Sequence, residues 1–198
     1  MHITLATLNL NKVREIVPMF AAHGIEARPL PEGLPFSVEE TGASFCENSD
    51  LKARAASFMM PGLVVAEDSG LEIDELGGFP GVLSSRIAGS DPERIATILA
   101  KLEGVPAVDR LARFRTCASL ARGGVILHHT EGIVDGVIAE APVGWNGFGY
   151  DPVFFYPPLG RTFAELALEE KNRVSHRMRA LTAMAEYLTK HPEVFGAP

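Results

Sequence analysis

The first quarter of the chain contains apolar runs typical of strands and apolar spacing typical of helices. Residues 2–7 form a short run of the kind that a buried strand requires. The apolar residues of the next segment recur at i, i+3, i+4 and i+7: Val13, Ile16, Val17 and Phe20. This pattern predicts an amphipathic helix with Asn11 as its N-cap and Gly24 just beyond its end.

Further elements follow up to residue 81. A second strand is predicted over residues 25–29, and a helix over residues 44–59, where Ser44 and Glu47 have capping-box spacing. An apolar strand over residues 63–66 then leads into AEDSGLEIDELGGFPG. The glycines and the proline of this stretch argue against a regular helix, and its first two carboxylates are expected to stand at the end of the strand.

The remaining pattern predicts a helix, a hairpin and a terminal helix. Asp91 and Pro92 supply an N-cap and a first-turn proline. Alternating residues over 110–122, a Gly-Gly pair and a second run over 125–141 predict a long hairpin. Ser175 can cap a last helix whose apolar face consists of Leu181, Met184, Ala185 and Leu188. This order predicts an α/β fold with a mixed sheet.

Length and charge bound the possible functions. With 198 residues and 46% hydrophobic content, the chain can bury a sizeable core, and a single cooperative unit is expected. A net charge of −7 argues against a general basic surface for nucleic acid. A small anionic substrate is still compatible with this charge if a few cations meet it locally.

Cysteine usage and hydropathy indicate a reduced, soluble environment. Cys46 and Cys117 lie far apart and form no CxxC or Cys/His pattern, so we expect two ordinary thiols and no zinc site. No leader-like start and no membrane-length apolar run is present. We therefore expect a cytoplasmic protein without a membrane partner.

Three kinds of polar segment could carry chemistry. Lys12 falls in the opening turn of a helix, where a cation is unfavourable unless something negative binds, although a solvated lysine is the commoner explanation of this segment alone. The acidic pairs 39–40 and 67–68 could share one divalent cation, because Mg2+ prefers oxygen ligands, although each pair could also be a solvated loop. The pair after the strand is the stronger candidate.

A third kind of segment combines aromatic and basic side chains. Phe148 or Tyr150 could stack on a heterocycle. Donors near the start of the last helix could meet a phosphate or a base carbonyl: Lys171, His176 and Arg177. A packed aromatic turn beside a charged helix explains the same residues without a ligand.

Five segments, taken together and in this order, resemble the inosine triphosphate pyrophosphatase family. They are ATLNLNK at 6–12, EETG at 39–42, AEDSGLEIDELGGFPGVLSSRIAG at 66–89, GFGYDPVF at 147–154, and AEL through EKNRVSHRMRAL at 164–181. The resemblance covers nearly the whole chain. It departs from the family pattern at Leu8, where members often have Gly, and at Glu67, where they often have Asp.

The resemblance implies a fold and a reaction. The fold would be a single domain over residues 1–198, an elongated two-lobed α/β structure with a long mixed sheet and a central cleft, assembled as a homodimer. The reaction would be Mg2+-dependent hydrolysis of ITP, dITP and XTP to the nucleoside monophosphate and pyrophosphate. This activity would keep deaminated purines out of nucleic acid, without stable nucleic-acid binding.

The resemblance also implies roles at the matched positions. Glu40 and Asp68 would hold the metal, and Asp68 would orient or deprotonate the attacking water. Contacts with the triphosphate are implied for Thr7, Asn9, Lys12 and Ser69. Phe148 would stack on the purine, and the remaining substrate contacts would fall on Gly149, Tyr150, Asp151, Lys171, His176 and Arg177.

Two other functions are compatible with the sequence. A related pyrophosphatase could act on other modified bases, such as pyrimidines, with the same phosphate chemistry. Alternatively, a regulatory module could bind nucleotides without hydrolysing them. The absence of a P-loop, a well-known motif of nucleotide hydrolases, is compatible with this alternative. The combination of Glu40 and Asp68 favours catalysis over simple binding.

Overall fold

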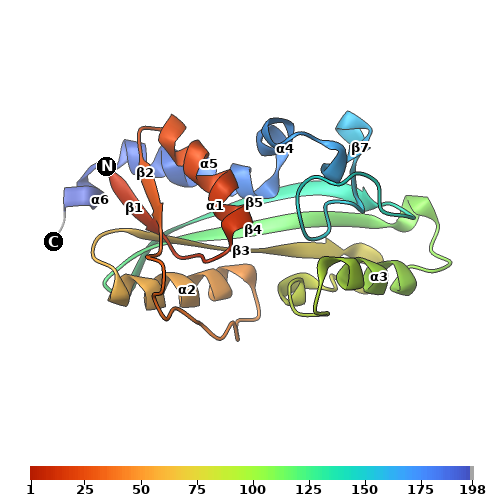
Figure 1. The fold of residues 1–198 in the computed structure, drawn as a ribbon, viewed down its shortest axis with the longest axis horizontal. Coiled ribbons are helices and arrows are strands. Elements are labelled where there is room, and N and C mark those ends of the chain that lie inside the picture. Colours follow the sequence, from red (N-terminus) through yellow and green to blue (C-terminus); the bar gives the residue numbers. More distant parts are fainter. Residues whose placement is uncertain (197–198) are drawn as a thin grey trace. The chain divides into compact units, whose positions relative to one another are not determined.

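The computed structural model describes residues 1–196 and contains an open, mixed seven-stranded sheet with helices packed on it (Figure 1). The strand order is β2-β1-β3-β4-β5-β6-β7. The strands are β1 (His2–Leu5), β2 (Glu26–Pro29), β3 (Val64–Ile73), β4 (Leu111–Arg122), β5 (Val125–Ile138), β6 (Phe154–Tyr156) and β7 (Arg161–Thr162). β1 pairs in parallel with β2 and β3, whereas β6 is antiparallel to β5 and β7. The predicted α/β class with a mixed sheet is confirmed.

Helices alternate with the strands in the first half of the chain and dominate its end. The α-helices are α1 (Leu10–Ala22), α2 (Phe45–Met59), α3 (Asp91–Lys101), α4 (Leu168–Val174), α5 (His176–Lys190) and α6 (Glu193–Gly196). Short 3-10 helices are η1 (Asp74–Leu76), η2 (Gly81–Leu83), η3 (Ala107–Asp109), η4 (Pro157–Leu159) and η5 (Phe163–Glu165).

The described residues divide into two compact units. Unit 1 consists of Met1–Asp68, Thr116–Gly132 and the segment that begins at Arg177; unit 2 consists of Ser69–Arg115 and Ile133–His176. The boundaries fall within β3, β4 and β5 and after the first residue of α5 (His176–Lys190), so these elements contribute residues to both units. The single domain and the central cleft expected from the sequence stay predictions.

In unit 1, helices cover both faces of the strands. α1 and α5 lie on one face and α2 lies on the other (Figure 1). Val65 packs in the cluster that contains Phe20 of α1, whereas Val64 and Ala66 pack in the cluster that contains Ala53 of α2. Successive strand residues point to opposite faces, so burial on both faces explains the uninterrupted apolar run at the start of β3.

Two helix caps differ from the predicted ones. Asn9, not Asn11, caps α1: its backbone is extended, and its Oδ1 accepts the N–H groups of Asn11 and Lys12. Ser90, not Asp91, caps α3 in the same way. An N-cap must lie just outside the helical turn to reach the free N–H groups, and only the folded backbone decides which of two nearby polar residues does so.

The predicted hairpin and the predicted helix α2 are confirmed. Ser44 Oγ accepts the N–H of Glu47, 3.1 Å away, at the start of α2. Gly123 and Gly124 join β4 to β5 with φ of 54° and 80°, a left-handed conformation that suits a two-residue hairpin turn. A Cβ on Gly124 would lie 2.1 Å from the exposed Phe58 ring of α2, which would have to move.

The strand that carries the acidic pair is longer than predicted. β3 continues from Val64 to Ile73, so Glu67 and Asp68 lie in the middle of a strand and not at its end. Both carboxylates are buried, and cations on both sides of the sheet compensate their charge. A strand can therefore include two consecutive buried acidic residues when cations compensate their charge. The local pattern of polar and apolar residues does not reveal this compensation.

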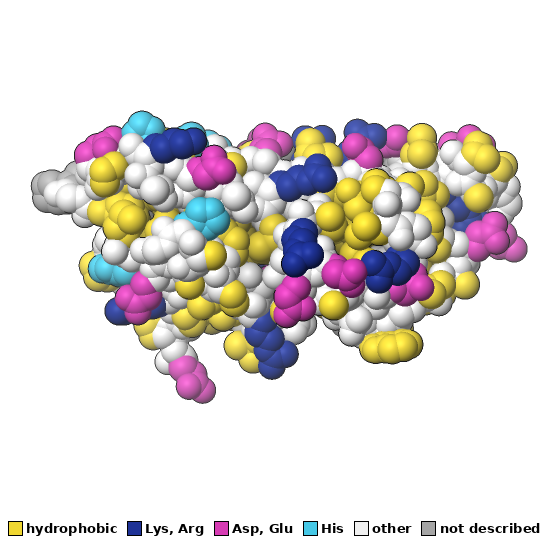
Figure 2. Space-filling model, turned by 90° about the horizontal axis from the view of Figure 1, so that it is seen from above, with side chains coloured by type: hydrophobic (Ala, Val, Ile, Leu, Met, Phe, Trp, Pro, Cys, Tyr) yellow, Lys and Arg dark blue, Asp and Glu magenta, His cyan; other side chains and the backbone are white. Residues whose placement is uncertain are grey.

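The charged side chains are mixed on the visible surface. Figure 2 shows basic and acidic residues interspersed on the face that it presents. Among the described residues, no helix is both long and apolar enough to cross a membrane.

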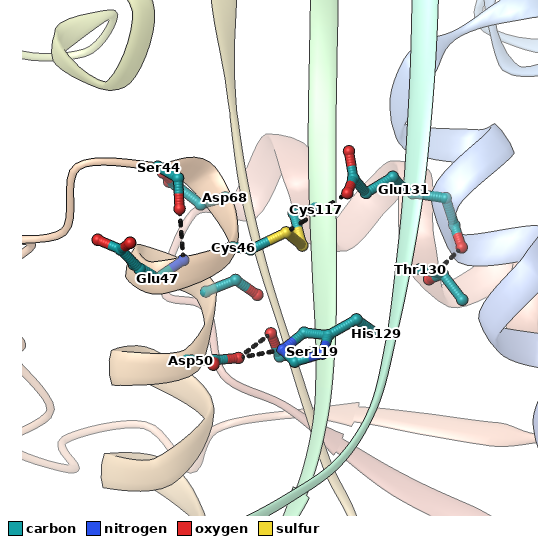
Figure 3. The surroundings of a disulfide bond; sticks show 12 residues. Ser44, Cys46, Glu47, Asp50, Asp68, Cys117, Ser119, His129, Thr130 and Glu131 are labelled. Carbon is teal, nitrogen blue, oxygen red and sulfur yellow. Dashed lines mark hydrogen bonds and ion pairs between the residues drawn. A yellow bond between two sulfur atoms is a disulfide. The ribbon is translucent and has the colours of Figure 1, made fainter.

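The two cysteines correct the expectation of ordinary thiols. Cys46 of α2 and Cys117 of β4 form a disulfide within unit 1, across 71 residues of sequence and with Cα atoms 5.0 Å apart (Figure 3). Sequence separation gave no indication of this contact, because it arises where α2 packs against the sheet.

Candidate functional site

β3 places two adjacent carboxylates in different surroundings. Glu67 lies on the α1 and α5 side, where its Oε1 is 2.6 Å from Lys12 Nζ. Asp68 lies on the α2 side, where its Oδ1 is 2.8 Å from Lys52 Nζ. The alternation of side chains along a strand therefore divides the acidic pair into two charge clusters.

The first cluster joins α1, β3 and α5. Arg177 Nη1 lies 2.6 Å from Glu15 Oε2, and Arg177 Nε lies 3.4 Å from Glu67 Oε1. Burial raises the pKa of the Glu67 carboxyl, but the positive charges of Lys12, Arg177 and Lys52 outweigh burial and hold this pKa below its ordinary value. Glu67 therefore stays ionised and anchors Lys12 at the start of α1.

The second cluster joins the predicted metal ligands. Lys52 Nζ lies 2.7 Å from Glu40 Oε1 and 2.8 Å from Asp68 Oδ1, so one ammonium group bridges both carboxylates. Burial raises the pKa of the Asp68 carboxyl, and the charge and hydrogen bond of Lys52 only partly oppose this effect. Burial lowers the pKa of Lys52, but Asp68 and its acidic neighbours bring it above its ordinary value.

Asn48 links the loop that carries Glu40 to the acidic strand. Its Nδ2 donates to Asp68 Oδ2 at 3.4 Å, and its Oδ1 accepts the Gly42 N–H at 2.8 Å. A Cβ on Gly42 would lie 2.7 Å from Asn48 Oδ1 and 2.6 Å from Glu47 Cβ, so this close approach requires glycine. The EETG segment is thereby fixed beside the second cluster.

The sequence interpretation missed Asn48 and Lys52. They are four residues apart on α2 and so lie on one face of that helix. The full burial of Asn48 indicates that it belongs to a polar site, but this burial is known only from the fold.

Thr7 and Asn9, both predicted to contact phosphate, stabilise the local backbone of the segment before α1. Asn9 Oδ1 caps the helix as described, and Thr7 Oγ1 accepts the Asn9 N–H at 3.2 Å. Asn9 and Leu8 are both exposed. This short exposed loop presents the N-terminus of α1 beside Lys12.

In unit 2, three of the predicted substrate residues converge. Asp151 Oδ2 accepts the Phe148 N–H at 2.9 Å and lies 2.6 Å from Lys171 Nζ. Lys171 Nζ also lies 4.8 Å from the centre of the Phe148 ring. Asp151 and Lys171 are buried, so this ion pair fixes the aromatic turn against α4.

Other predicted residues of unit 2 have structural partners. The Gly149 N–H donates to Asp91 Oδ2 at 2.7 Å, a contact that the sequence interpretation missed. The Tyr150 hydroxyl donates to the Ser84 carbonyl at 2.7 Å, and burial raises its pKa to about 12. His176 is buried and stacks on Phe114 with ring centres 4.5 Å apart. Ser69 is a half-buried residue of β3.

The donor set of the second cluster suits Mg2+. Glu40 and Asp68 both contact one ammonium group, so their carboxylates lie close enough together to share one metal ion beside Lys52. Among the described residues, no group of three or more His, Cys, Asp or Glu side chains could hold a metal by itself. Two carboxylates fit an ion that takes its remaining ligands from water and substrate phosphates.

Comparisons with known proteins agree with the fold. Residues 3–187 match the Ham1 family. The dITP/XTP pyrophosphatase of Geobacillus kaustophilus is 49% identical over 93% of each chain. That of Bacillus subtilis is 42% identical over 93% of this chain and 95% of the relative. The structure of a HAM1 protein from Coxiella burnetii superposes with a TM-score of 0.86 at 39% identity, covering 96% of this chain and 99% of that one.

Proposed function

This chain belongs to the Ham1 family, and from that premise we propose that it hydrolyses dITP, ITP and XTP to nucleoside monophosphates and pyrophosphate. The observation that carries the proposal is the convergence of Glu40 and Asp68 on Lys52. Burial raises the pKa of the Asp68 carboxyl beside a second carboxylate, and shifted acids of this kind cluster at catalytic sites, which favours a hydrolase over a binding module. The activity would remove deaminated purine nucleotides before they are incorporated into nucleic acid.

The proposed chemistry breaks the bond between the α- and β-phosphates. Asp68 would accept a proton from a water molecule as its oxygen attacks the α-phosphorus, and pyrophosphate would leave. Mg2+, when bound by Glu40 and Asp68, would offset the negative charge of the phosphates. Lys12, held by Glu67 at the start of α1, would stabilise the charge that develops on the phosphate oxygens.

Recognition of the base is proposed for one aromatic ring and a small set of hydrogen-bond donors. The Phe148 ring would stack on the purine. A donor from His176 or Arg177 would meet the C6 oxygen of hypoxanthine or xanthine, and Lys171 would contribute a base-side or phosphate-side donor. Adenine carries an amino group at C6, and one unmade buried hydrogen bond costs about 1–3 kcal/mol. Guanine also has a C6 oxygen, so this contact does not distinguish GTP.

The homodimer is proposed on the family resemblance, whereas the cytoplasmic location rests on the hydropathy of the sequence, because the disulfide removes the argument from free thiols. We expect a homodimer in the cytoplasm, and light scattering coupled to gel filtration would measure the mass directly. A monomeric mass at working concentration would contradict the dimer.

A panel of nucleoside triphosphates with and without Mg2+ tests the reaction, substrate and cofactor together. Pyrophosphate release is expected for dITP, ITP and XTP, far above ATP, and only with Mg2+. Preference for a modified pyrimidine would favour a related pyrophosphatase. Tight binding without pyrophosphate release would favour a regulatory module.

A further inference from the structure

The Cys46–Cys117 disulfide fixes the beginning of the helix that carries Lys52. Cys46 is the second residue of α2, and Cys117 lies in β4, with both residues in unit 1 (Figure 3). Asn48 follows Cys46 by two residues and lies in the same first turn of the helix, whereas Lys52 lies more than a turn further on. A displacement of the first turn would therefore move Asn48, which donates to Asp68.

Later turns of α2 have other anchors. Asp50 Oδ1 accepts from Ser119 Oγ at 2.7 Å and lies 2.6 Å from His129 Nε2. Arg54 Nη1 donates to the Gly124 carbonyl at 2.8 Å. Opening the disulfide would therefore loosen the first turn while the rest of the helix stays attached to the sheet.

The two sulfur atoms differ in access. Cys46 is half-buried, whereas Cys117 is 0% exposed. A small dithiol can therefore attack Cys46 Sγ and release Cys117 as the leaving thiolate. The second thiol of the reductant then attacks the mixed disulfide at its own sulfur, so the protein gains two thiols and the dithiol becomes a disulfide.

The surroundings of Cys46 bear on the rate of this exchange. The N-terminus of α2 favours a thiolate at Cys46. Glu131 Oε1 lies 3.8 Å from Cys46 Sγ, and its negative charge opposes an approaching thiolate (Figure 3). The site is thus open to exchange at one sulfur, with an acidic neighbour that slows it.

We propose that Cys46 and Cys117 form a reversible redox site that controls hydrolysis by positioning the first turns of α2. The disulfide holds Asn48 against Asp68 and the Gly42 N–H, and reduction by a dithiol releases these contacts. The effect on turnover rests on the proposed function, but the change in α2 does not. In the cytoplasm, thiol reductants would favour the reduced state, so the disulfide would form only under oxidising conditions.

The experiment compares the full-length oxidised protein before and after treatment with dithiothreitol. Hydrogen exchange of residues 45–52 is expected to accelerate on reduction and to recover on reoxidation. kcat for dITP with saturating Mg2+ is expected to fall about tenfold, because small displacements of catalytic groups are costly. The double variant Cys46→Ser, Cys117→Ser is expected to match the reduced protein and to ignore the dithiol.

The two readouts separate the possible failures. If α2 exchange accelerates but kcat stays constant, the disulfide is structural only and the proposed control is overturned. If exchange of residues 45–52 is unchanged on reduction, the positioning argument itself is overturned. If neither state hydrolyses any nucleotide, the proposed function fails, while the exchange measurement still decides whether the disulfide orders α2.

Discussion

Glu67 and Asp68 are consecutive residues of β3, yet they bind different lysines: Glu67 contacts Lys12 of α1, and Asp68 contacts Lys52 of α2. Because the two carboxylates lie on opposite faces of the strand, their pKa values move in opposite directions, lowered for Glu67 and raised for Asp68. The two residues should therefore respond differently to the same kind of substitution.

Asp68→Asn should abolish most of the hydrolysis and leave the fold intact. The amide has nearly the same shape but cannot accept a proton from water or hold a metal as a carboxylate does. We expect kcat for dITP to fall by at least about a hundredfold. Asp135→Asn is the matched control, because that side chain is 84% exposed in β5. A folded Asp68→Asn protein with near-normal pyrophosphate release would remove Asp68 from the catalytic role.

Glu67→Gln should mainly reduce stability. It removes the carboxylate that pairs with Lys12 and one of the two carboxylates beside the buried Arg177, and breaking a buried ion pair typically costs about 3 kcal/mol in the free energy of unfolding. Urea denaturation at pH 7 measures this loss. Glu26→Gln is the control, since Glu26 and Arg28 form an exposed pair with an expected effect below about 1 kcal/mol.

The loss of unfolding free energy caused by Glu67→Gln should depend on pH. The folded pKa of Glu67 lies below its ordinary value of 4.5, so its stabilising contribution is complete above that pH. The contribution disappears as the pH falls through the lower, folded pKa. The difference between wild type and variant should therefore shrink below pH 4.5, and a constant difference down to strongly acidic pH would contradict the lowered pKa.

Lys52→Met should shift the pH dependence of catalysis. Burial already raises the pKa of Asp68, and the charge of Lys52 opposes that rise. Without this charge the pKa of Asp68 rises further, so the acidic limb of kcat/KM should move to higher pH. The control is Lys190→Met, an exposed lysine of α5 paired with Glu186. An acidic limb that stays in place would show that Lys52 does not act through Asp68.

Phe148→Leu should weaken substrate use more than it slows chemistry. Loss of a stacked ring costs about 1–3 kcal/mol per base, so KM for dITP should rise about tenfold or more with a smaller change in kcat. Trp145→Leu provides a matched control three residues earlier, because Trp145 is 90% exposed. Equal KM values for the two variants would argue against stacking on Phe148.

Local sequence patterns predicted most elements of the fold. Helix α1, helix α2 and the β4–β5 hairpin follow from apolar spacing, capping residues and the Gly123-Gly124 pair. These features act through neighbouring residues along the chain, so the sequence displays them directly. The residues of the candidate site were proposed from motifs in the same way, including Glu40, Asp68 and Lys12.

The sequence by itself thus determined the α/β class, the main helices and the chemical types available for a phosphate site. Only the tertiary structure decided that Glu67 and Asp68 face different helices, that Lys52 bridges Asp68 to Glu40, and that Cys46 meets Cys117. Each of these relationships joins residues on separate elements. Their distances depend on how helices pack against the two faces of a strand, and no spacing along the chain encodes that packing.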